Sequence, residues 1–377
     1  MLLCAVFAAF YAQKHHYRVF FLYFFMTDTN KASVAIVILN WNGVAHLKQF
    51  LPSVLRTSYP NHQLWVIDNG STDGSVAFLQ QNYGEKIKLI TLTQNLGYAG
   101  GYQAGLAQIT SDYYVLLNSD VQTPENWLSE LMAFAQLHPL LAAAQPQILS
   151  HAQPTHFEYA GAAGGLIDAL AYPFCQGRIF AHTEPNTNQY TEAKQIFWAS
   201  GACMLLKTEA FWQVGGLDPA FFAHMEEIDL CWRLQNANHQ IWYCPTAQVE
   251  HLGGGTLQYG STRKTYLNFR NSLIAIYKNT PLWQGILLIS IRVFVLDPIA
   301  ALQMLLNNQR KHAAVIFKAH IDFIKNLKAH SLSRRKTPQK TSLWKLQGVA
   351  HKSIVFSYFV LNKKTVLPPD ASGIKCL

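Results

Sequence analysis

Residues Trp65-Val66-Ile67-Asp68-Asn69-Gly70-Ser71-Thr72-Asp73-Gly74-Ser75 decide the fold class of this chain, because a short apolar run ends abruptly in a polar, glycine-rich loop. The same pattern occurs at residues 35–43 and again at residues 113–120. Apolar runs of about four to eight residues rich in Val, Ile and Leu are typical of strands buried on both faces. Ligands of open α/β sheets bind beyond the carboxyl ends of such strands, so the three loops predict one composite site that handles a nucleotide.

Strand and helix patterns alternate along the first 150 residues. The expected strands are Val34–Leu39, Gln63–Ile67, Ile87–Leu92, Tyr113–Leu117 and Leu141–Ile148, and the expected helices are His46–Thr57, Ser75–Asn82, Tyr98–Ile109 and Pro124–Leu137. This alternation predicts an α/β fold with a mostly parallel, Rossmann-like sheet and helices on both faces. Loops are expected to dominate residues 150–195, and a second organised block is expected at about 196–280, with a helix near Glu226–Asn238.

The length of 377 residues and the 50% hydrophobic content suit one large α/β domain with appendages. The six cysteines are scattered without the spacing of a zinc site or a disulfide framework, which indicates a reducing compartment.

Positive charge is concentrated at the C-terminal end. The net charge is +9, and residues 301–377 alone carry 14 Lys and Arg against two acids. This tail follows the apolar run Leu282–Leu296, which is shorter than the roughly 20 residues that a membrane span needs. We therefore expect residues 281–377 to lie on an anionic membrane surface, through an interfacial helix backed by cations. The alternative is a buried core helix followed by a solvated basic tail.

Residues 1–25 hold two short apolar pieces around the basic stretch Lys14–Arg18, and neither piece reaches spanning length. We expect translation to start at Met26 and the domain to occupy residues 26–280, with a signal anchor as the alternative for the leader.

Carboxylates stand at the ends of two expected strands. Asp68 directly follows one strand and can accept a hydrogen bond from a pyrimidine ring, whereas Asp73 in the same loop serves equally well as a cap of the next helix. Asp120 ends the Asn118-Ser119-Asp120 triplet and is the expected ligand of a divalent metal that neutralises a leaving diphosphate. His251, before a glycine-rich loop, is the best protein candidate for a further ligand.

The segment Asn95-Leu96-Gly97-Tyr98-Ala99-Gly100-Gly101 follows the third strand and opens a helix. Its glycines are expected to let the backbone approach a ligand, and a helix N-terminus favours an anion.

Glu226, Glu227 and Asp229 crowd the start of one expected helix. Acids in a first turn suit the helix dipole, and crowded carboxylates raise one another's pKa, which is useful in a general base. Arg233 is expected to pair with an acid one turn back.

Taken in order, these motifs resemble the family 2 glycosyltransferases, which have the fold type called GT-A. Within that family, the chain is most similar to the rhamnosyltransferase-type members that build cell-surface polysaccharides. The resemblance covers about residues 34–280. It rests on residues 37–43, 68–75, 95–101 and 118–120, then on Gly201-Ala202-Cys203-Met204-Leu205, Gly215-Gly216-Leu217-Asp218, the acidic helix and Arg270-Asn271.

The resemblance implies an inverting transferase that uses a nucleotide sugar (UDP-, dTDP- or GDP-linked), Mg²⁺ or Mn²⁺, and a glycan or lipid-linked acceptor at the cytoplasmic face of the plasma membrane. Asp68 would hold the base, Asp120 and His251 the metal, and Glu227, with Glu226 in reserve, would deprotonate the acceptor. Further donor contacts are expected at Asn40, Asn42, Asn95, Gly97, Gly101 and Asn118, and acceptor contacts at Gly201, Ala202 and Asp229. The family commonly has Glu-Asp where this chain has Glu226-Glu227, and Asn118 replaces the first acid of its metal motif.

Three functions other than glycosyl transfer are possible for such a chain. A nucleotidyltransferase would carry a basic residue in the loop after its first strand, and Asn40–Gly43 has none. A nucleic-acid-binding protein would interleave its cations with a recognition motif, which the basic tail lacks, so no nucleic-acid partner is expected. A non-catalytic relative that binds nucleotide sugars or glycans remains the alternative, although Asp68, Asp120 and Glu227 favour an enzyme. The sugar, the nucleotide, the acceptor and the oligomeric state stay open.

Overall fold

The computed structural model describes residues 31–253, 261–336 and 340–365. The expectations for the leader (residues 1–25), for most of the loop behind His251 and for the last residues of the basic tail therefore lie outside the described residues.

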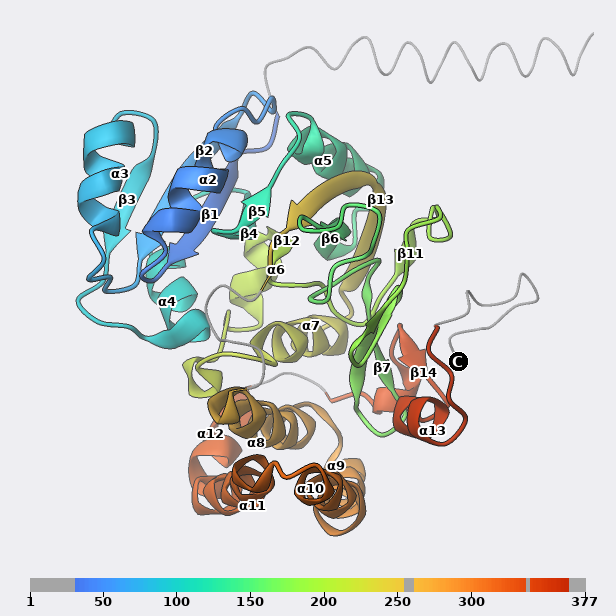
Figure 1. Cartoon of the computed structure of the whole chain (residues 1–377). Helices are drawn as coiled ribbons and strands as arrows, with labels where there is room; N and C mark the ends of the chain where they lie inside the picture. The colour runs from blue at the N-terminus through green and yellow to red at the C-terminus, as the bar shows by residue number, and fades with distance from the viewer. Residues whose placement is uncertain (1–30, 254–260, 337–339, 366–377) are drawn as a thin grey trace, which may run out of the picture.

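A nine-stranded sheet runs through the molecule in the order β11-β13-β6-β12-β4-β1-β2-β3, with β5 paired to β13 (Figure 1). Its strands are β1 (Val34–Asn40), β2 (His62–Asp68), β3 (Lys88–Thr91), β4 (Tyr113–Asn118), β5 (Val121–Gln122), β6 (Leu141–Ser150), β11 (Lys194–Gln195), β12 (Cys203–Lys207) and β13 (Gln240–His251).

Strand β1 pairs in parallel with β2 and with β4, and β2 pairs in parallel with β3, as the alternating pattern predicts. Strand β12, however, is antiparallel to both β4 and β6. The sheet is therefore mixed beyond β4, since an apolar run shows that a strand is buried but not which way it points.

Alternate side chains of the strands enter two cores on opposite faces of the sheet. Val34, Ile36 and Ile38 of β1 join the core beneath α2 (Val44–Val54), α3 (Ser75–Tyr83) and α5 (Trp127–Leu137). Ala35 and Val37 face the other core, beneath α4 (Gly97–Leu106), α6 (Thr208–Gln213) and α7 (Glu226–Asn236). Helices thus cover both faces, as predicted.

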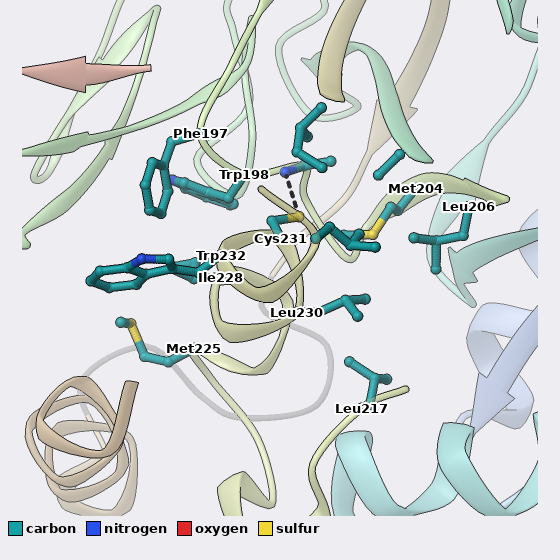
Figure 2. Close-up of a cluster of buried hydrophobic side chains, with 14 of the residues drawn as sticks. Phe197, Trp198, Met204, Leu206, Leu217, Met225, Ile228, Leu230, Cys231 and Trp232 are labelled. Atoms are coloured by element: carbon teal, nitrogen blue, oxygen red, sulfur yellow. Dashed lines mark hydrogen bonds between the residues drawn. The ribbon is translucent and has the colours of Figure 1, made fainter. Parts of the chain in front are cut away.

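Helix α7 is the centre of the second core. Ile228, Leu230, Cys231 and Trp232 pack among Phe197, Trp198, Met204, Leu206, Leu217 and Met225, and the Ala199 backbone N–H donates to Cys231 Sγ at 3.4 Å (Figure 2). The apolar side of this helix is therefore fixed in the core, and its first turn is held in one place.

Residues 150–195 are not simply loops, because most of a second, five-stranded sheet forms there. Its order is β10-β9-β8-β7-β14, with β7 (Gly165–Asp168), β8 (Pro173–Cys175), β9 (Arg178–Ile179), β10 (His182–Thr183) and β14 (Val349–Ala350). Strand β14 comes from the far C-terminal region and pairs in parallel with β7. These strands are too short to show a period-two pattern, which explains why the sequence did not predict them.

The remaining helices gather at one end of the molecule, beyond α7 (Figure 1). They are α8 (Thr262–Asn279), α9 (Leu282–Ile291), α10 (Asp297–Leu306), α11 (Arg310–Lys325) and α12 (Leu327–Lys336), while the short α13 (Ile354–Phe359) lies beside the small sheet. A π-helical turn, Arg292–Leu296, joins α9 to α10. Among the described residues, Leu282–Leu306 forms one helical segment that is long and apolar enough to cross a membrane by length and composition. The apolar run is therefore longer than Leu282–Leu296.

Candidate active site

The carboxyl ends of β1, β2 and β4 meet at one edge of the sheet. Asn40 is in register with Asp68, and Leu39 is in register with Asn118, so the last residues of the three strands are neighbours. This is the composite site that the three polar loops predict, since parallel strands in register end together.

A hydrogen-bonded network fixes Asp68 at this edge. Asn40 Nδ2 donates to Asp68 Oδ2 at 2.9 Å, and the Ser71 backbone N–H donates to Asp68 Oδ1 at 2.9 Å. Asp68 is 2% exposed, and the buried Asn40 Oδ1 has no hydrogen-bond partner. Asn42 lies beside them, accepting from the Thr72 backbone N–H at 2.7 Å. The Asp68 carboxylate is thus held rigidly, with lone pairs left for a further donor.

Asp73 acts within the protein. Its Oδ2 accepts from the Val44 backbone N–H at 2.9 Å, and its Oδ1 accepts from the Ser75 backbone N–H at 3.0 Å. These bonds satisfy backbone donors at the starts of α2 and α3, so the capping alternative describes Asp73.

The glycine-rich segment at the start of α4 is shaped by protein contacts. Asn95 Oδ1 accepts from the Gly97 backbone N–H at 2.8 Å, and Gly97 has a φ of +75°. A Cβ on Gly97 would collide with Phe222, and a Cβ on Gly101 would lie 2.8 Å from Leu39 Cδ1. These two glycines therefore let α4 pack closely against Phe222 and Leu39.

The loop before β12 closes one side of the site. Tyr98 donates its hydroxyl to the Gly201 carbonyl at 2.8 Å, and the Asn118 backbone N–H donates to the Ala202 carbonyl at 3.0 Å. Gly201 and Ala202 are buried, and both contacts use their main-chain carbonyls.

His251 lies between two carboxylates. Its Nε2 is 3.1 Å from Asp120 Oδ1, and its Nδ1 is 3.1 Å from Glu158 Oε2. Burial lowers the pKa of His251, but Asp120 and Glu158 outweigh burial and raise it to about 10. Asn118 Nδ2 is a further neighbour, 3.3 Å from His251 Nε2. The site therefore concentrates negative charge where a cation is favoured.

Sequence reasoning missed Glu158. It is 4% exposed and belongs to the segment expected to be loops, where neither periodicity nor a motif marks it. The structure brings it to His251 because β6 and β13 are parallel neighbours, and Glu158 is bonded through its backbone N–H to the Ile148 carbonyl of β6. Only this tertiary pairing could have identified it.

Glu226 and Glu227 form the first turn of α7 with little compensation for their charge. Burial, more than the neighbouring carboxylate, raises the pKa of Glu226 well above its ordinary value, and burial raises the pKa of Glu227 to about 7. One oxygen of each carboxylate, Oε2, is buried without a hydrogen-bond partner. This environment stabilises the protonated form of Glu226 and Glu227, so that either side chain, when ionised, readily accepts a proton.

Asp229 differs from the two glutamates. Arg233 Nη2 and Lys278 Nζ lie 2.8 and 2.9 Å from its Oδ2, and Asn279 Nδ2 donates to its Oδ1 at 2.8 Å. Against the effect of burial, the two cations hold its pKa below the ordinary value. Because it is fully buried and saturated with donors, Asp229 faces the core and not an acceptor, which corrects the expectation of acceptor binding. Its bond to Arg233 confirms the expected pairing one turn away.

Glu158, Glu226 and Glu227 influence the pKa values of two nearby residues, Cys175 and Tyr98. Burial raises the pKa of the Cys175 thiol; Arg178 opposes this increase, and the charges of Glu158 and Glu227 add to it. Burial also raises the pKa of Tyr98, with contributions from Glu226 and Glu227, and Tyr98 is the residue that binds the Gly201 carbonyl. Glu158 and Glu227 thus both act on Cys175, and Glu226 and Glu227 both act on Tyr98.

The segment that leads into α7 is conformationally costly. Phe222, His224 and Met225 have φ values of 63°, 69° and 71°, in the left-handed region that residues with side chains avoid. Each such residue costs on the order of 1–3 kcal/mol and persists where the surroundings enforce it, commonly at functional sites. The backbone before Glu226 and Glu227 thus adopts an unfavourable conformation that the surrounding structure enforces.

Comparison with known proteins shows what this arrangement resembles. Residues 33–215 match the family described as Glycosyl transferase family 2. The chain is 29% identical over 241 residues to an N-acetylglucosaminyl-diphospho-decaprenol L-rhamnosyltransferase of Mycobacterium tuberculosis, covering 60% of this chain and 76% of that protein. It is 25% identical over 248 residues to a low-salt glycan biosynthesis hexosyltransferase of Haloferax volcanii, covering 64% of this chain and 75% of that protein.

Among solved structures, the fold is similar to that of GalNAc-T7 crystallised with UDP, GalNAc and Mn²⁺. The TM-score is 0.53 at 14% identity, and the match covers 67% of this chain and 49% of that chain. This likeness concerns the fold alone and confirms the α/β architecture expected for the sheet.

Proposed function

Because the chain carries a family 2 glycosyltransferase domain, we propose that it moves a sugar from a nucleoside-diphosphate sugar to a hydroxyl of a lipid-linked glycan acceptor, with inversion at the anomeric carbon. The observation that carries this proposal is the pair of glutamates at the start of α7, Glu226 and Glu227, each of which has a carboxylate oxygen, Oε2, that is buried without a hydrogen-bond partner. The named activities of the two curated relatives support the reaction class, and the name of the rhamnosyltransferase supports the lipid-diphosphate type of acceptor.

Glu227 is the proposed general base. Its raised pKa makes the carboxylate a stronger proton acceptor than an exposed glutamate, because ionisation in a buried place is costly. Glu227 takes the proton of the acceptor hydroxyl, the oxygen forms a bond to the anomeric carbon, and the bond from that carbon to the diphosphate breaks. The nucleoside diphosphate leaves with the electron pair.

Asp68 is the proposed contact to the nucleotide base, with the Asn40 amide holding it in orientation at 2.9 Å. Asn42 and Asn95 would border the same donor pocket. Asn118, whose amide nitrogen lies 3.3 Å from His251 Nε2, would contact the donor, and Gly97 and Gly101 would let the backbone of α4 approach it.

The residues present fit a divalent ion. Asp120 Oδ1 lies 3.1 Å from His251 Nε2, so a carboxylate and an imidazole that could both hold the ion are neighbours. Glu158 on the far nitrogen is the kind of partner that orients a metal-binding imidazole. Within the described residues no group of three or more metal-binding side chains occurs, so the remaining ligands would be diphosphate oxygens and water. A bound Mg²⁺ or Mn²⁺ would offset the charge of the leaving diphosphate.

We further propose that the helices beyond α8 rest on the cytoplasmic face of an anionic membrane. Their outer surface is apolar, with more than half of each of these side chains exposed: Leu282, Trp283, Ile286, Phe294, Ile299, Leu302, Ile321 and Ile324. The inner side of the same segment is polar and buried, because Arg292 pairs with Asp297 at 2.8 Å and Asp297 pairs with His320 at 2.8 Å. One side is thus fastened to the protein, which favours lying in the interface over crossing it.

The charge around this surface suits anionic lipid. Between residues 281 and 336 the acids are Asp297 and Asp322, and both are paired with cations. The exposed cations Arg310, Lys311, Lys325 and Lys328 each add about 1 kcal/mol of attraction near such a surface.

A donor screen tests the reaction class. UDP-, dTDP- and GDP-sugars are offered with Mn²⁺ and a polyprenyl diphosphate-linked N-acetylglucosamine acceptor, and released nucleoside diphosphate is measured. We expect turnover with one nucleotide class. The variant Asp68→Ala should bind that nucleotide at least about tenfold more weakly, because it loses a charge-assisted hydrogen bond. Donor binding without any transfer or hydrolysis would favour the non-catalytic alternative.

Replacing the base tests the mechanism. Glu227→Gln should lower kcat about 10²- to 10⁴-fold and leave donor affinity within about twofold, because the amide cannot accept the proton. In the parent enzyme the ionised base is the active form, so turnover should increase with pH up to about 7 and then level off; the residual turnover of the variant should lack this increase. Glu209→Gln, an exposed glutamate on α6, is the matched control. Full turnover of Glu227→Gln would rule out the base assignment.

Nucleotide binding tests the metal ligands. Mn²⁺ should tighten the binding of the nucleoside diphosphate to the parent protein, and Asp120→Asn or His251→Asn should remove that effect while metal-free binding persists. Because the ion must displace a proton from His251, whose pKa is about 10, the Mn²⁺ effect should grow about tenfold per pH unit between pH 6.5 and 7.5. Calorimetric titration measures both, and His138→Ala is the control. An unchanged Mn²⁺ response in both variants would count against these ligands.

Vesicle binding tests the membrane surface. Phe294→Asp combined with Ile299→Asp should reduce sedimentation with phosphatidylglycerol vesicles by more than tenfold, since each apolar side chain contributes about 1.5–3 kcal/mol when buried. Leu137→Asp, an equally exposed apolar residue at the end of α5, should leave binding unchanged. Equal loss in both proteins, or no loss in either, would refute the assignment of this surface.

A further inference from the structure

The Arg270-Asn271 pair, singled out in the sequence without a role, lies in the middle of α8 and faces the segment that precedes α7. Neither residue belongs to the donor or metal groups described above. Their hydrogen bonds run to main-chain carbonyls of residues 220–224.

Asn271 is completely buried, and its amide nitrogen, with two hydrogens, lies within hydrogen-bonding distance of three carbonyls. Its Nδ2 lies 2.9 Å from the Phe221 oxygen, 2.9 Å from the Ala223 oxygen and 2.7 Å from the His224 oxygen. An amide oxygen in that place would face three acceptors, so only the Nδ2 can occupy it. The Oδ1 on the other side accepts from Arg270 Nε at 2.9 Å.

Arg270 completes this arrangement from the outside. Its Nη2 donates to the Ala220 oxygen at 2.9 Å and to the Phe221 oxygen at 3.1 Å. One guanidinium therefore fixes both the Asn271 side chain and the beginning of the segment. A lysine has a single charged nitrogen and cannot make this full set of hydrogen bonds.

The segment needs such external bonds because its own sequence does not favour its shape. Phe222 has φ 63° and ψ −62°, and the Ala223 backbone N–H donates to the Phe221 carbonyl at 2.8 Å, which defines a γ-turn of the rare, positive-φ kind. Met225, the residue at the N-cap of α7, is also left-handed and makes no side-chain capping bond. Residues 222–225 contain no glycine that would relieve these positions.

The next two residues along the chain are Glu226 and Glu227. Resting on the proposed function, we propose that Asn271 and Arg270 are positioning residues that hold the 220–225 turn in its strained form and thereby place the Glu227 carboxylate against the acceptor hydroxyl. The same turn contacts the donor side of the site, since the Phe222 carbonyl accepts from the Ala99 backbone N–H of α4 at 3.1 Å.

Releasing the turn should misplace the base without removing it. A displacement of about 1 Å in a reacting group can cost on the order of 10²-fold in rate. Asn271→Ala should therefore lower kcat about 10- to 100-fold, with the binding of the nucleoside diphosphate selected by the donor screen kept within about twofold.

A double-mutant comparison distinguishes positioning from general damage. If Asn271 acts through Glu227, Asn271→Ala should cause no more than about twofold further loss in the Glu227→Gln background, because the base it positions is already inactive. Loss of the full factor in that background overturns the inference. Full turnover of Glu227→Gln alone would instead show that the proposed base is wrong, so the two failures are distinct.

Two further variants control for stability. Asn236→Ala removes a buried asparagine at the other end of α7, where Nδ2 donates to the Asn279 carbonyl at 3.0 Å and Oδ1 accepts from the Thr341 backbone N–H at 3.0 Å. It should lower Tm about as much as Asn271→Ala and retain turnover; equal loss of turnover would overturn the inference. If Asn271→Ala does not fold, the partly exposed Arg270 provides the test: Arg270→Ala should lose turnover that Arg270→Lys restores only in part, and equal activity of the two variants would contradict the proposal.

Discussion

Strand β1 pairs in parallel with β2 on one side and with β4 on the other, and its in-register ends bring Asn40, Asp68 and Asn118 to one edge of the sheet. Parallel pairing requires helical crossovers on both faces, and these helices supply the two cores that keep the sheet rigid. The polar groups of the site can therefore be fixed within hydrogen-bonding distance of one another without the cost of ordering them again for each substrate.

Buried charge is treated in two opposite ways within one turn of α7. Asp229 is surrounded by Arg233, Lys278 and Asn279, so its charge is compensated and it stabilises the contact between α7 and α8. Glu226 and Glu227 receive no such partners for their Oε2 atoms, and burial raises the pKa of both. The difference separates a structural carboxylate from groups suited to proton transfer, although all three lie within four consecutive residues.

Helix α8 connects the proposed membrane surface with the start of α7. Through Arg270 and Asn271 it holds the turn before Glu226, and through Lys278 it pairs with Asp218 at 2.6 Å and with Asp229 at 2.9 Å. Its Ser272 accepts from Arg292 at 3.2 Å, and Arg292 belongs to the π-helical turn between α9 and α10. Under the two proposals, an acceptor that arrives from a lipid surface would meet the proposed base, Glu227, on a turn held by the same helix that contacts the proposed membrane surface.

The sequence by itself determined the strands β1 to β4, the helices between them and the edge at which Asp68 and Asp120 lie, because burial on both faces and the loss of apolar character at a strand end are local properties. It did not determine that β12 runs antiparallel, since strand direction leaves no mark on composition, nor the small sheet, whose strands are too short for a period. Glu158 beside His251, the saturation of Asp229 and the hold of Asn271 on the 220–225 turn were decided by the tertiary structure alone. Each depends on groups from distant parts of the chain meeting at hydrogen-bonding distance, and only the packed fold sets those distances.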